Sequence, residues 1–338
     1  MCVQITTDDW RPAIGCITWI FETAKQDIHS FLLPPSGNRK RYSIERACHE
    51  MEVYVLNIDG LQGGHSGVDI HKKLGNAIKV TARVLEGIRK QADIQLVALE
   101  GGSRINVIPR QTQAIIAFEP GQRDRIQGVL DDLRQEIGRE FERETNLTIV
   151  FSPLPFRDKS RADFSAADTG RIIALLLNLP NGVAAMDPRY PGSVETSNNL
   201  ATVNSDFEGI HLMSFQRSSD PAALDERSTK IRTIAWKAGG EGNDVSRLAA
   251  WQPDFKSNLV ARSQDVFQKL YGHPPALSVV HGGLECGVIA LKYPGLDVMS
   301  IGPSIQGAHS PAEKLFLPSV AKVREFLSAL LASFNNLQ

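Results

Sequence analysis

Two histidines of this sequence stand in glycine-rich stretches, where an imidazole can be presented to a ligand. His65 lies in Gly63-Gly64-His65-Ser66-Gly67, and glycines let the backbone adopt positive φ and approach other groups closely. His309 lies in "SIGPSIQGAHSP", after a strand-like run, and ligands or metals are often held at the carboxyl end of a strand in an α/β sheet. For each histidine the alternative is a plain turn with a solvent-exposed ring.

Three further stretches carry polar groups suited to binding a small polar ligand. "VVHGGLECG" places His281 and Glu285 around a glycine pair, and the carboxylate is suited to a ligand's ammonium group. Arg217 follows a strand-like run and offers a planar fork for a carboxylate, whereas Asn106 both donates and accepts hydrogen bonds. The alternatives are a simple turn for the first pair and solvation of a sheet edge for the second.

The elements that must position these residues follow from hydrophobic periodicity. Apolar residues at three- and four-residue steps predict helices, and β-branched or aromatic runs ended by turn residues predict strands. The segments expected to be helical are 70–88, 126–141, 163–178, the stretch from Asp220-Pro221 onwards, 259–271 and the stretch from Pro318 onwards. The segments expected to be strands are 53–59, two runs around Pro109, 194–203, 210–216, 277–281 and 296–301, with a loop over 180–192.

These elements indicate an α/β protein with an α+β portion, in which an antiparallel sheet is layered with helices. A chain of 338 residues fits about two domains. The change in residue pattern near Val53 and the "GGEG" at 239–242 divide the chain into 1–50, 51–239 and 240–338. The first segment shows no sustained period, and we expect it to be poorly packed.

Composition excludes several classes of protein. Lysine and arginine number 37 against 38 acidic residues, so there is no basic excess for binding nucleic acid. Four cysteines without C-x-x-C spacing indicate reduced thiols in a cytosol. The longest early apolar run, nine residues from Ala13 to Phe21, is far below the ~20 needed for a membrane helix, and no basic segment of a signal peptide precedes it. We therefore expect a soluble cytoplasmic protein.

Several stretches, taken together and in order, closely resemble the aminoacyl-histidine dipeptidases, which are also called Xaa-His or cytosol non-specific dipeptidases. The matching strings are "LNIDGLQGGHSGVDIHKKLGNA", "GGSRINVIPR", "VETSNNLATV", "AWQPDFKSNLV", "VVHGGLECGV" and "MSIGPSIQGAHSP". The family is a branch of the two-zinc exopeptidases, metallopeptidases in which a lid or dimerisation domain is inserted into an α/β zinc domain. The resemblance implies that 51–239 is the lid and 240–338 the C-terminal part of the zinc domain.

The resemblance also implies roles for individual residues. His65 is similar to the lid histidine that crosses a homodimer interface to polarise the scissile carbonyl of a dipeptide substrate. Asn106 resembles a second lid residue that supports this carbonyl or the substrate, and Arg217 the arginine that receives the dipeptide's carboxylate. His309 resembles the last zinc ligand, and Glu285 lies in what resembles a substrate-lining loop.

The rest of the family's metal site has no counterpart in this sequence. The family uses two zinc ions per subunit, with manganese or cobalt as alternatives, held through a His-x-Asp motif, a Glu-Glu pair and further aspartates. The sequence contains neither His-x-Asp nor Glu-Glu. Because a catalytic zinc needs about three protein ligands, we expect an N-terminally truncated chain that is inactive alone. The alternative is a non-catalytic dimerisation module that pairs with itself or with an intact homologue.

Overall fold

The structure is a computed structural model. It describes residues 2–5, 17–18, 25–35, 51–154, 164–188, 192–248, 257–278, 281, 289, 292–306 and 313–334.

A large antiparallel sheet forms most of the described chain. Its strands lie side by side in the order β13, β3, β12, β11, β6, β8, β4 and β9, and β10 pairs with β11 off this path. In chain order they are β3 (Lys25–Leu33), β4 (Glu52–Asp59), β6 (Ile94–Gly101), β8 (Thr112–Phe118), β9 (Thr148–Pro153), β10 (Gly182–Met186), β11 (Val194–Ser205), β12 (Ile210–Ser218) and β13 (Glu241–Leu248). Every pairing among them is antiparallel, although several neighbouring strands are far apart in the sequence.

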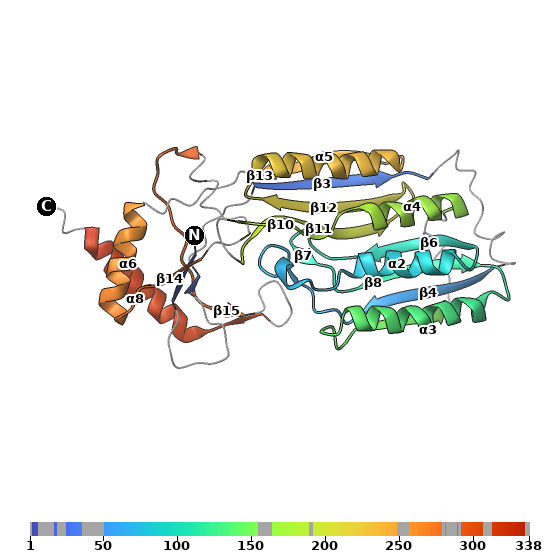
Figure 1. Cartoon of the computed structure of the whole chain (residues 1–338), viewed down its shortest axis with the longest axis horizontal. Helices are drawn as coiled ribbons and strands as arrows, with labels where there is room; N and C mark the ends of the chain where they lie inside the picture. The colour runs from blue at the N-terminus through green and yellow to red at the C-terminus, as the bar shows by residue number, and fades with distance from the viewer. Residues whose placement is uncertain are drawn as a thin grey trace.

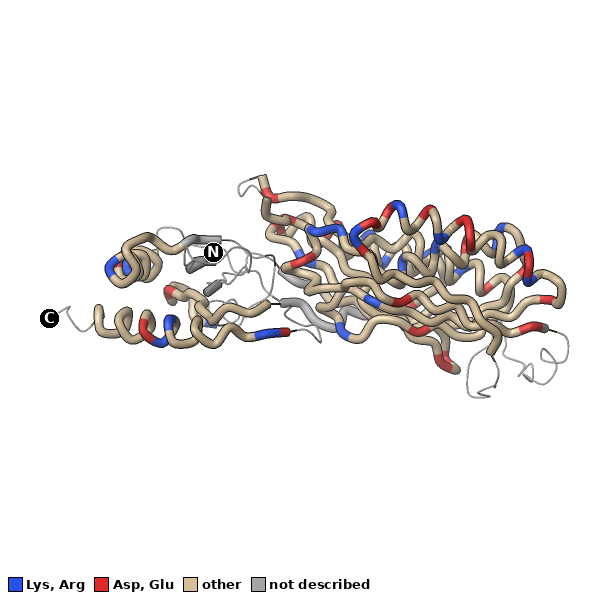
Figure 2. Tube along the Cα trace, turned by 90° about the horizontal axis from the view of Figure 1, so that it is seen from below, with Lys and Arg blue, Asp and Glu red and all other residues tan. Residues whose placement is uncertain are grey.

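Four helices cover one face of this sheet (Figures 1 and 2). They are α2 (Ala77–Arg89), α3 (Arg123–Glu140), α4 (Ala166–Asn178) and α5 (Pro221–Lys237). α2, α3 and α5 turn an apolar stripe inward and a charged face outward, whereas the exposed positions of α4 are occupied by alanine and asparagine.

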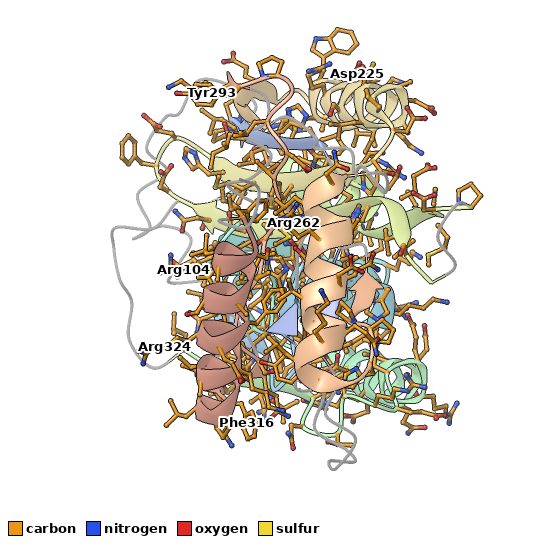
Figure 3. The ribbon with its side chains drawn as sticks, turned by 90° about the vertical axis from the view of Figure 1, so that its left-hand side faces the viewer. Arg104, Asp225, Arg262, Tyr293, Phe316 and Arg324 are labelled. Carbon is orange, nitrogen blue, oxygen red and sulfur yellow. The ribbon has the colours of Figure 1, made fainter. Side chains whose placement is uncertain are left out.

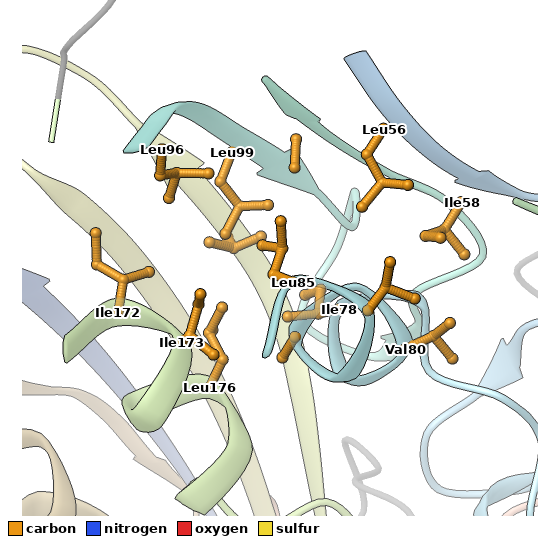
Figure 4. Close-up of a cluster of buried hydrophobic side chains, with 14 of the residues drawn as sticks. Leu56, Ile58, Ile78, Val80, Leu85, Leu96, Leu99, Ile172, Ile173 and Leu176 are labelled. Atoms are coloured by element: carbon orange, nitrogen blue, oxygen red, sulfur yellow. The ribbon is translucent and has the colours of Figure 1, made fainter. Parts of the chain in front are cut away.

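The main core lies between the helices and the sheet. Side chains of α2, including Ile78 and Leu85, lie between Leu56 of β4 and Ile173 of α4 (Figure 4). All of these are fully or almost fully buried. Burying a side chain of this size contributes roughly 1.5–3 kcal/mol, so this layer is the main source of stability in the described chain.

A smaller part of the molecule lies at the other end of its long axis (Figure 1). Here α6 (Asn258–Tyr271) and α8 (Leu317–Phe334) pack side by side through Phe267 and Phe326 (Figure 3). The strand pairs in this part are short: β1 (Cys2–Ile5) pairs with β2 (Ile17–Thr18) and β14 (Ala276–Ser278), and β15 (Ile305–Gln306) pairs with β16 (Lys314–Leu315).

The fold class expected from the sequence is confirmed, and the bounds of three segments differ from expectation. The helix expected from residue 70 begins at Ala77, because Gly75 and the N-cap Asn76 interrupt the stripe after the short 3-10 helix η1 (Ile70–Lys72). The run at 296–301 forms no strand, and β10 occupies the expected loop at 180–192.

The expectation of poor packing is wrong for part of the N-terminal segment. β3 pairs with β12 along its whole length and with β13 on its other edge, and its Phe31 and Leu33 are buried in the main core. None of the helices in the described ranges is both long enough and apolar enough to cross a membrane.

Candidate active site

His65 lies in a short strand that the glycines allow to form. β5 (Gly64–His65) pairs with β7 (Val107–Ile108), so His65 lies opposite Val107. Gly63 has φ 65° and Gly64 φ 143°, which are values that residues with a Cβ rarely adopt. The glycine-rich turn therefore holds His65 in a defined register instead of presenting it on a loose loop.

The hydrogen bonds around His65 select one tautomer of its ring. Its backbone N–H donates to Asp69 Oδ2 at 2.8 Å. Its Nδ1 accepts from the backbone N–H groups of Gly67 at 3.2 Å and Val68 at 3.1 Å. A nitrogen that accepts hydrogen bonds carries no proton, so the proton of the neutral ring lies on Nε2. The half-buried ring is thus arranged to donate a hydrogen bond through Nε2.

Asn106 lies beside the glycine turn in a loop that a buried amide holds on both sides. Its carbonyl oxygen accepts from the backbone N–H of Ser66 at 2.8 Å. Asn199 of β11 donates through Nδ2 to the carbonyl oxygens of Ile105 at 3.1 Å and Val107 at 2.8 Å. Two residues singled out from the sequence, His65 and Asn106, therefore lie close together in the fold.

Arg217 is held near the end of β12 in a buried position. Its side chain is 3% exposed, and its Cζ lies 4.2 Å from the centre of the Phe215 ring. Such stacking restrains the guanidinium plane, which suits bidentate binding of a carboxylate. In the strand register Arg217 lies directly opposite Ser197 of β11.

His281 completes this group of residues. Its Nε2 and the Ser197 hydroxyl are 2.7 Å apart, and both side chains are buried. Its carbonyl oxygen lies so close to Gly67 that a Cβ at that position would clash with it. Burial lowers the pKa of His281 to about 3, helped by the positive charge of Arg217 and by His65, while the Val194 backbone acts weakly in the opposite direction. His281 is therefore neutral at physiological pH.

The sequence singled out His281 only as a neighbour of Glu285, and it missed Ser197 altogether. No local pattern marks Ser197, since its part in the group comes from the pairing of β11 with β12 and from a hydrogen bond across 84 residues. Glu285 and His309 lie outside the described residues.

The described residues do not provide the ligand set of a two-metal centre. Among them, the one group of histidine and acidic side chains close enough to share a metal is Asp206, Glu208 and His211. Asp206 Oδ1 accepts from the backbone N–H groups of Glu208 and Gly209, which is ordinary hydrogen bonding in a hairpin turn. This turn lies at the opposite end of β12 from Arg217, about 20 Å away at ~3.3 Å per residue. The trio is therefore not part of the candidate site.

Comparison with known proteins gives matches in both sequence and structure. Residues 57–145 match the family of the peptidase dimerisation domain. The chain is 32% identical over 281 residues to the cytosol non-specific dipeptidase of Escherichia coli (strain K12), which covers 83% of this chain and 57% of that protein. It is similar in structure to aminoacylhistidine dipeptidase from Vibrio alginolyticus, with a TM-score of 0.75 and 28% identity, over 93% of this chain and 62% of the other.

The Vibrio protein shares the mixed α/β fold, and both relatives are peptidases by name. The chain spans about three fifths of the length of each of them. Residues 57–145 thus match the peptidase dimerisation domain, within a chain that is similar to the cytosol non-specific and aminoacylhistidine dipeptidases.

Proposed function

We propose that this chain is the substrate-recognition and dimerisation part of a dipeptidase that hydrolyses Xaa-His and other dipeptides. The observation that carries the proposal is the gathering of a buried arginine, Arg217, with a histidine whose Nε2 is set to donate, His65, around the neutral His281. The names of the two relatives support the same substrate class.

Each residue has a distinct task in this proposal. Arg217 binds the carboxylate of the dipeptide through its planar fork, which fixes the substrate's direction. His65 donates through Nε2–H to the oxygen of the scissile carbonyl, and Asn106 supports the same oxygen or the adjoining backbone. One such donor to a developing oxyanion was worth about 2.7–4 kcal/mol in another hydrolase. We assign Glu285 to the wall of the substrate site.

The metal is the part of the reaction that this chain does not support by itself. A bound zinc pair would supply an activated water for this hydrolysis. We propose His309 as one ligand, but the sequence has neither a His-x-Asp nor a Glu-Glu motif, and the described acidic trio lies at the far end of β12. These residues do not fit a two-zinc site, and a polypeptide of this sequence should be inactive alone.

A dimerisation module is the second candidate function, and the match to a peptidase dimerisation domain favours it. In this variant of the proposal the chain pairs through residues 51–239 with itself or with an intact homologue, and lends His65 to the partner's site. Residues 240–338 then correspond to the C-terminal part of the zinc domain. We propose a cytosolic location, because the curated relative is a cytosol dipeptidase by name.

Two assays test these proposals. The purified chain, supplied with Zn²⁺ or Mn²⁺ and a dipeptide such as alanyl-histidine, is expected to show no turnover. Robust turnover that His309→Ala abolishes would contradict the proposed inactivity.

The second assay asks for rescue by the chain. The E. coli dipeptidase, with alanine replacing the histidine that matches His65, is mixed with this chain, and recovered hydrolysis that His65→Ala removes is expected for a lent histidine. Absence of both a mixed dimer and recovered hydrolysis would rule out the lending of His65 to an intact homologue.

A further inference from the structure

A single buried carboxylate joins the two ends of the segment that carries His65. The backbone N–H of Gln62 donates to Glu144 Oε2 at 2.7 Å, and that of Gly75 donates to Glu144 Oε1 at 2.9 Å. Glu144 lies 82 residues from Gln62 in sequence, in the turn that follows α3. One side chain therefore closes residues 62–75, in which His65 lies, into a loop.

The turn around Glu144 is built to hold this carboxylate in place. The backbone N–H of Glu144 donates to the carbonyl of Phe141 at 2.8 Å, and the N–H of Leu147 donates to the carbonyl of Glu144 at 2.9 Å. Gln62 adds a side-chain hydrogen bond from Nε2 to the carbonyl of Arg143 at 2.6 Å. Gln62, at the first end of the loop, is thus hydrogen-bonded to this turn through both its backbone and its side chain.

The environment of Glu144 is unusual for an acidic residue. It is 5% exposed, and within the described part of the chain no lysine, arginine or histidine forms an ion pair with it. Acidic side chains are seldom buried unless they are paired, so the two peptide N–H groups must offset the loss of solvation. Each carboxylate oxygen accepts a hydrogen bond from one of these two backbone N–H groups. A glutamine amide in the same place would direct its own NH₂ group toward one of the backbone N–H groups.

We propose that Glu144 is a positioning residue for His65. By holding Gln62 and Gly75 together, it keeps the loop in the conformation in which the amides of Gly67 and Val68 reach Nδ1 of His65. Those two hydrogen bonds select the Nε2–H tautomer, so the carboxylate acts on the donor without touching it. This inference rests on the proposed role of His65 as a donor to the substrate's carbonyl.

Apolar contacts also hold the loop, and they offer an explanation of its conformation that does not need Glu144. Leu61 is buried in the main core, and Ile70 packs with Ile108 and Val194. If these anchors alone set the loop, loss of the carboxylate would loosen only residues 62 and 75. If Glu144 positions His65, the effect must reach the hydrogen bonds of the imidazole.

Glu144→Gln tests this in the full chain, with Glu142→Gln as the matched control. Glu142 lies in the same turn and is exposed. Amide hydrogen exchange and the imidazole nitrogen shifts of ¹⁵N-labelled histidine are compared with the unaltered protein. In Glu144→Gln we expect exchange to rise about tenfold or more at Gly67 and Val68, and the His65 nitrogens to move toward the averaged shifts of a mobile ring. Amides of β8 should stay protected, and Glu142→Gln should leave all these signals unchanged.

The proposal is overturned if the His65 nitrogen shifts of Glu144→Gln equal those of the unaltered chain while exchange at Gln62 and Gly75 rises. Should that variant fold poorly, Glu144→Asp keeps the charge on a side chain one methylene shorter. It should shift the same signals by a smaller amount, and unchanged signals there would equally refute the role.

These signals do not depend on turnover, so the clamp and the proposed function can fail separately. If the unaltered chain rescues the histidine-deficient E. coli dipeptidase, Glu144→Gln should rescue it up to about 100-fold more slowly with little change in KM, because misplacing a catalytic donor costs rate. If the unaltered chain does not rescue but the His65 shifts respond, the positioning role of Glu144 stands and the lending of His65 to a homologue falls.

Discussion

At the scale of single residues, the candidate site depends on an uncharged histidine beside a buried arginine. His281 is kept neutral by burial first, and then by the positive charge of Arg217 and by His65. A protonated ring there would repel the guanidinium that is proposed to bind the substrate's carboxylate. The hydrogen bond to Ser197 offsets part of the free-energy cost of burying the neutral ring.

The low pKa of His281 predicts a specific loss of stability in acid. In the unfolded chain this histidine takes up a proton near its ordinary pKa of 6.5, whereas in the folded chain it does so only near 3. Its contribution to the free energy of unfolding is therefore complete above pH 6.5, falls by up to about 1.4 kcal/mol per pH unit below it, and is fully lost below about pH 3. Urea unfolding of His281→Gln between pH 7 and 4.5 should show a shallower decline, while the exposed His71→Gln should follow the unaltered protein. Equal slopes in all three proteins would show that His281 titrates normally.

Substitution of Arg217 tests the proposed recognition of the carboxylate. Arg217→Lys keeps the charge but loses the planar fork and the stacking on Phe215, so we expect dipeptide affinity to fall about tenfold or more. Calorimetric titration with a dipeptide and with its C-terminal amide shows how much of the affinity comes from the free carboxylate. The amide should bind weakly to the unaltered chain and change little in the variant. Unchanged affinity for the free dipeptide would place the carboxylate elsewhere.

At the scale of elements, the N-caps of α5 and α2 differ in whether their hydrogen bonds stay within the helix or also reach another element. Asp220 is exposed and caps α5 locally, because its side chain accepts a hydrogen bond from the backbone N–H of Ala222 at 2.8 Å. Pro221 is the first residue of the helix. Asn76 caps α2 by accepting from Ile78 and Lys79, but its Nδ2 also donates to the carbonyl of Leu200 on β11. The first cap can be recognised in the sequence, whereas the second also ties a helix to the sheet.

Alanine at these two caps should therefore have unequal effects. Asp220→Ala should cost about 1 kcal/mol, the usual loss of a cap. Asn76→Ala should cost roughly 1–3 kcal/mol more, because it also leaves the buried carbonyl of Leu200 without this donor. The free energies of unfolding from urea denaturation give both values. Similar losses for the two variants would mean that the bond to β11 contributes nothing.

At the scale of the whole molecule, the two ends are covered to different degrees. The sheet and its four helices enclose a continuous core, whereas α8 buries only one side against α6. The other side of α8 exposes a row of large apolar residues, namely Leu317, Val320, Leu327 and Leu331. Exposed apolar rows of this kind mark surfaces that associate with other protein.

Two adjacent leucines of α8 distinguish its covered side from its uncovered side. Leu330 is 3% exposed and Leu331 is 60% exposed. Leu330→Ala should destabilise the chain by about 2–5 kcal/mol, whereas Leu331→Glu should stay within roughly 0.5 kcal/mol and reduce self-association in light scattering. A large loss of stability from Leu331→Glu would show that the uncovered side is packed in solution.

The sequence by itself determined the elements whose signals are local. α3 and α8 follow from apolar residues at helical spacing, and α5 follows from its start at Asp220-Pro221, because helix hydrogen bonds and caps join residues close in sequence. The motifs around His65, Asn106 and Arg217 could likewise be recognised from the residues themselves.

Only the tertiary structure decided how these pieces meet. The insertion of β3 between β12 and β13, the pairing of Ser197 with His281 and the grip of Glu144 on Gln62 all join residues more than 80 positions apart. Such contacts form only when strands that are distant in sequence pair in the sheet and bring their side chains and backbone groups within hydrogen-bonding distance. No periodicity along the chain indicates them.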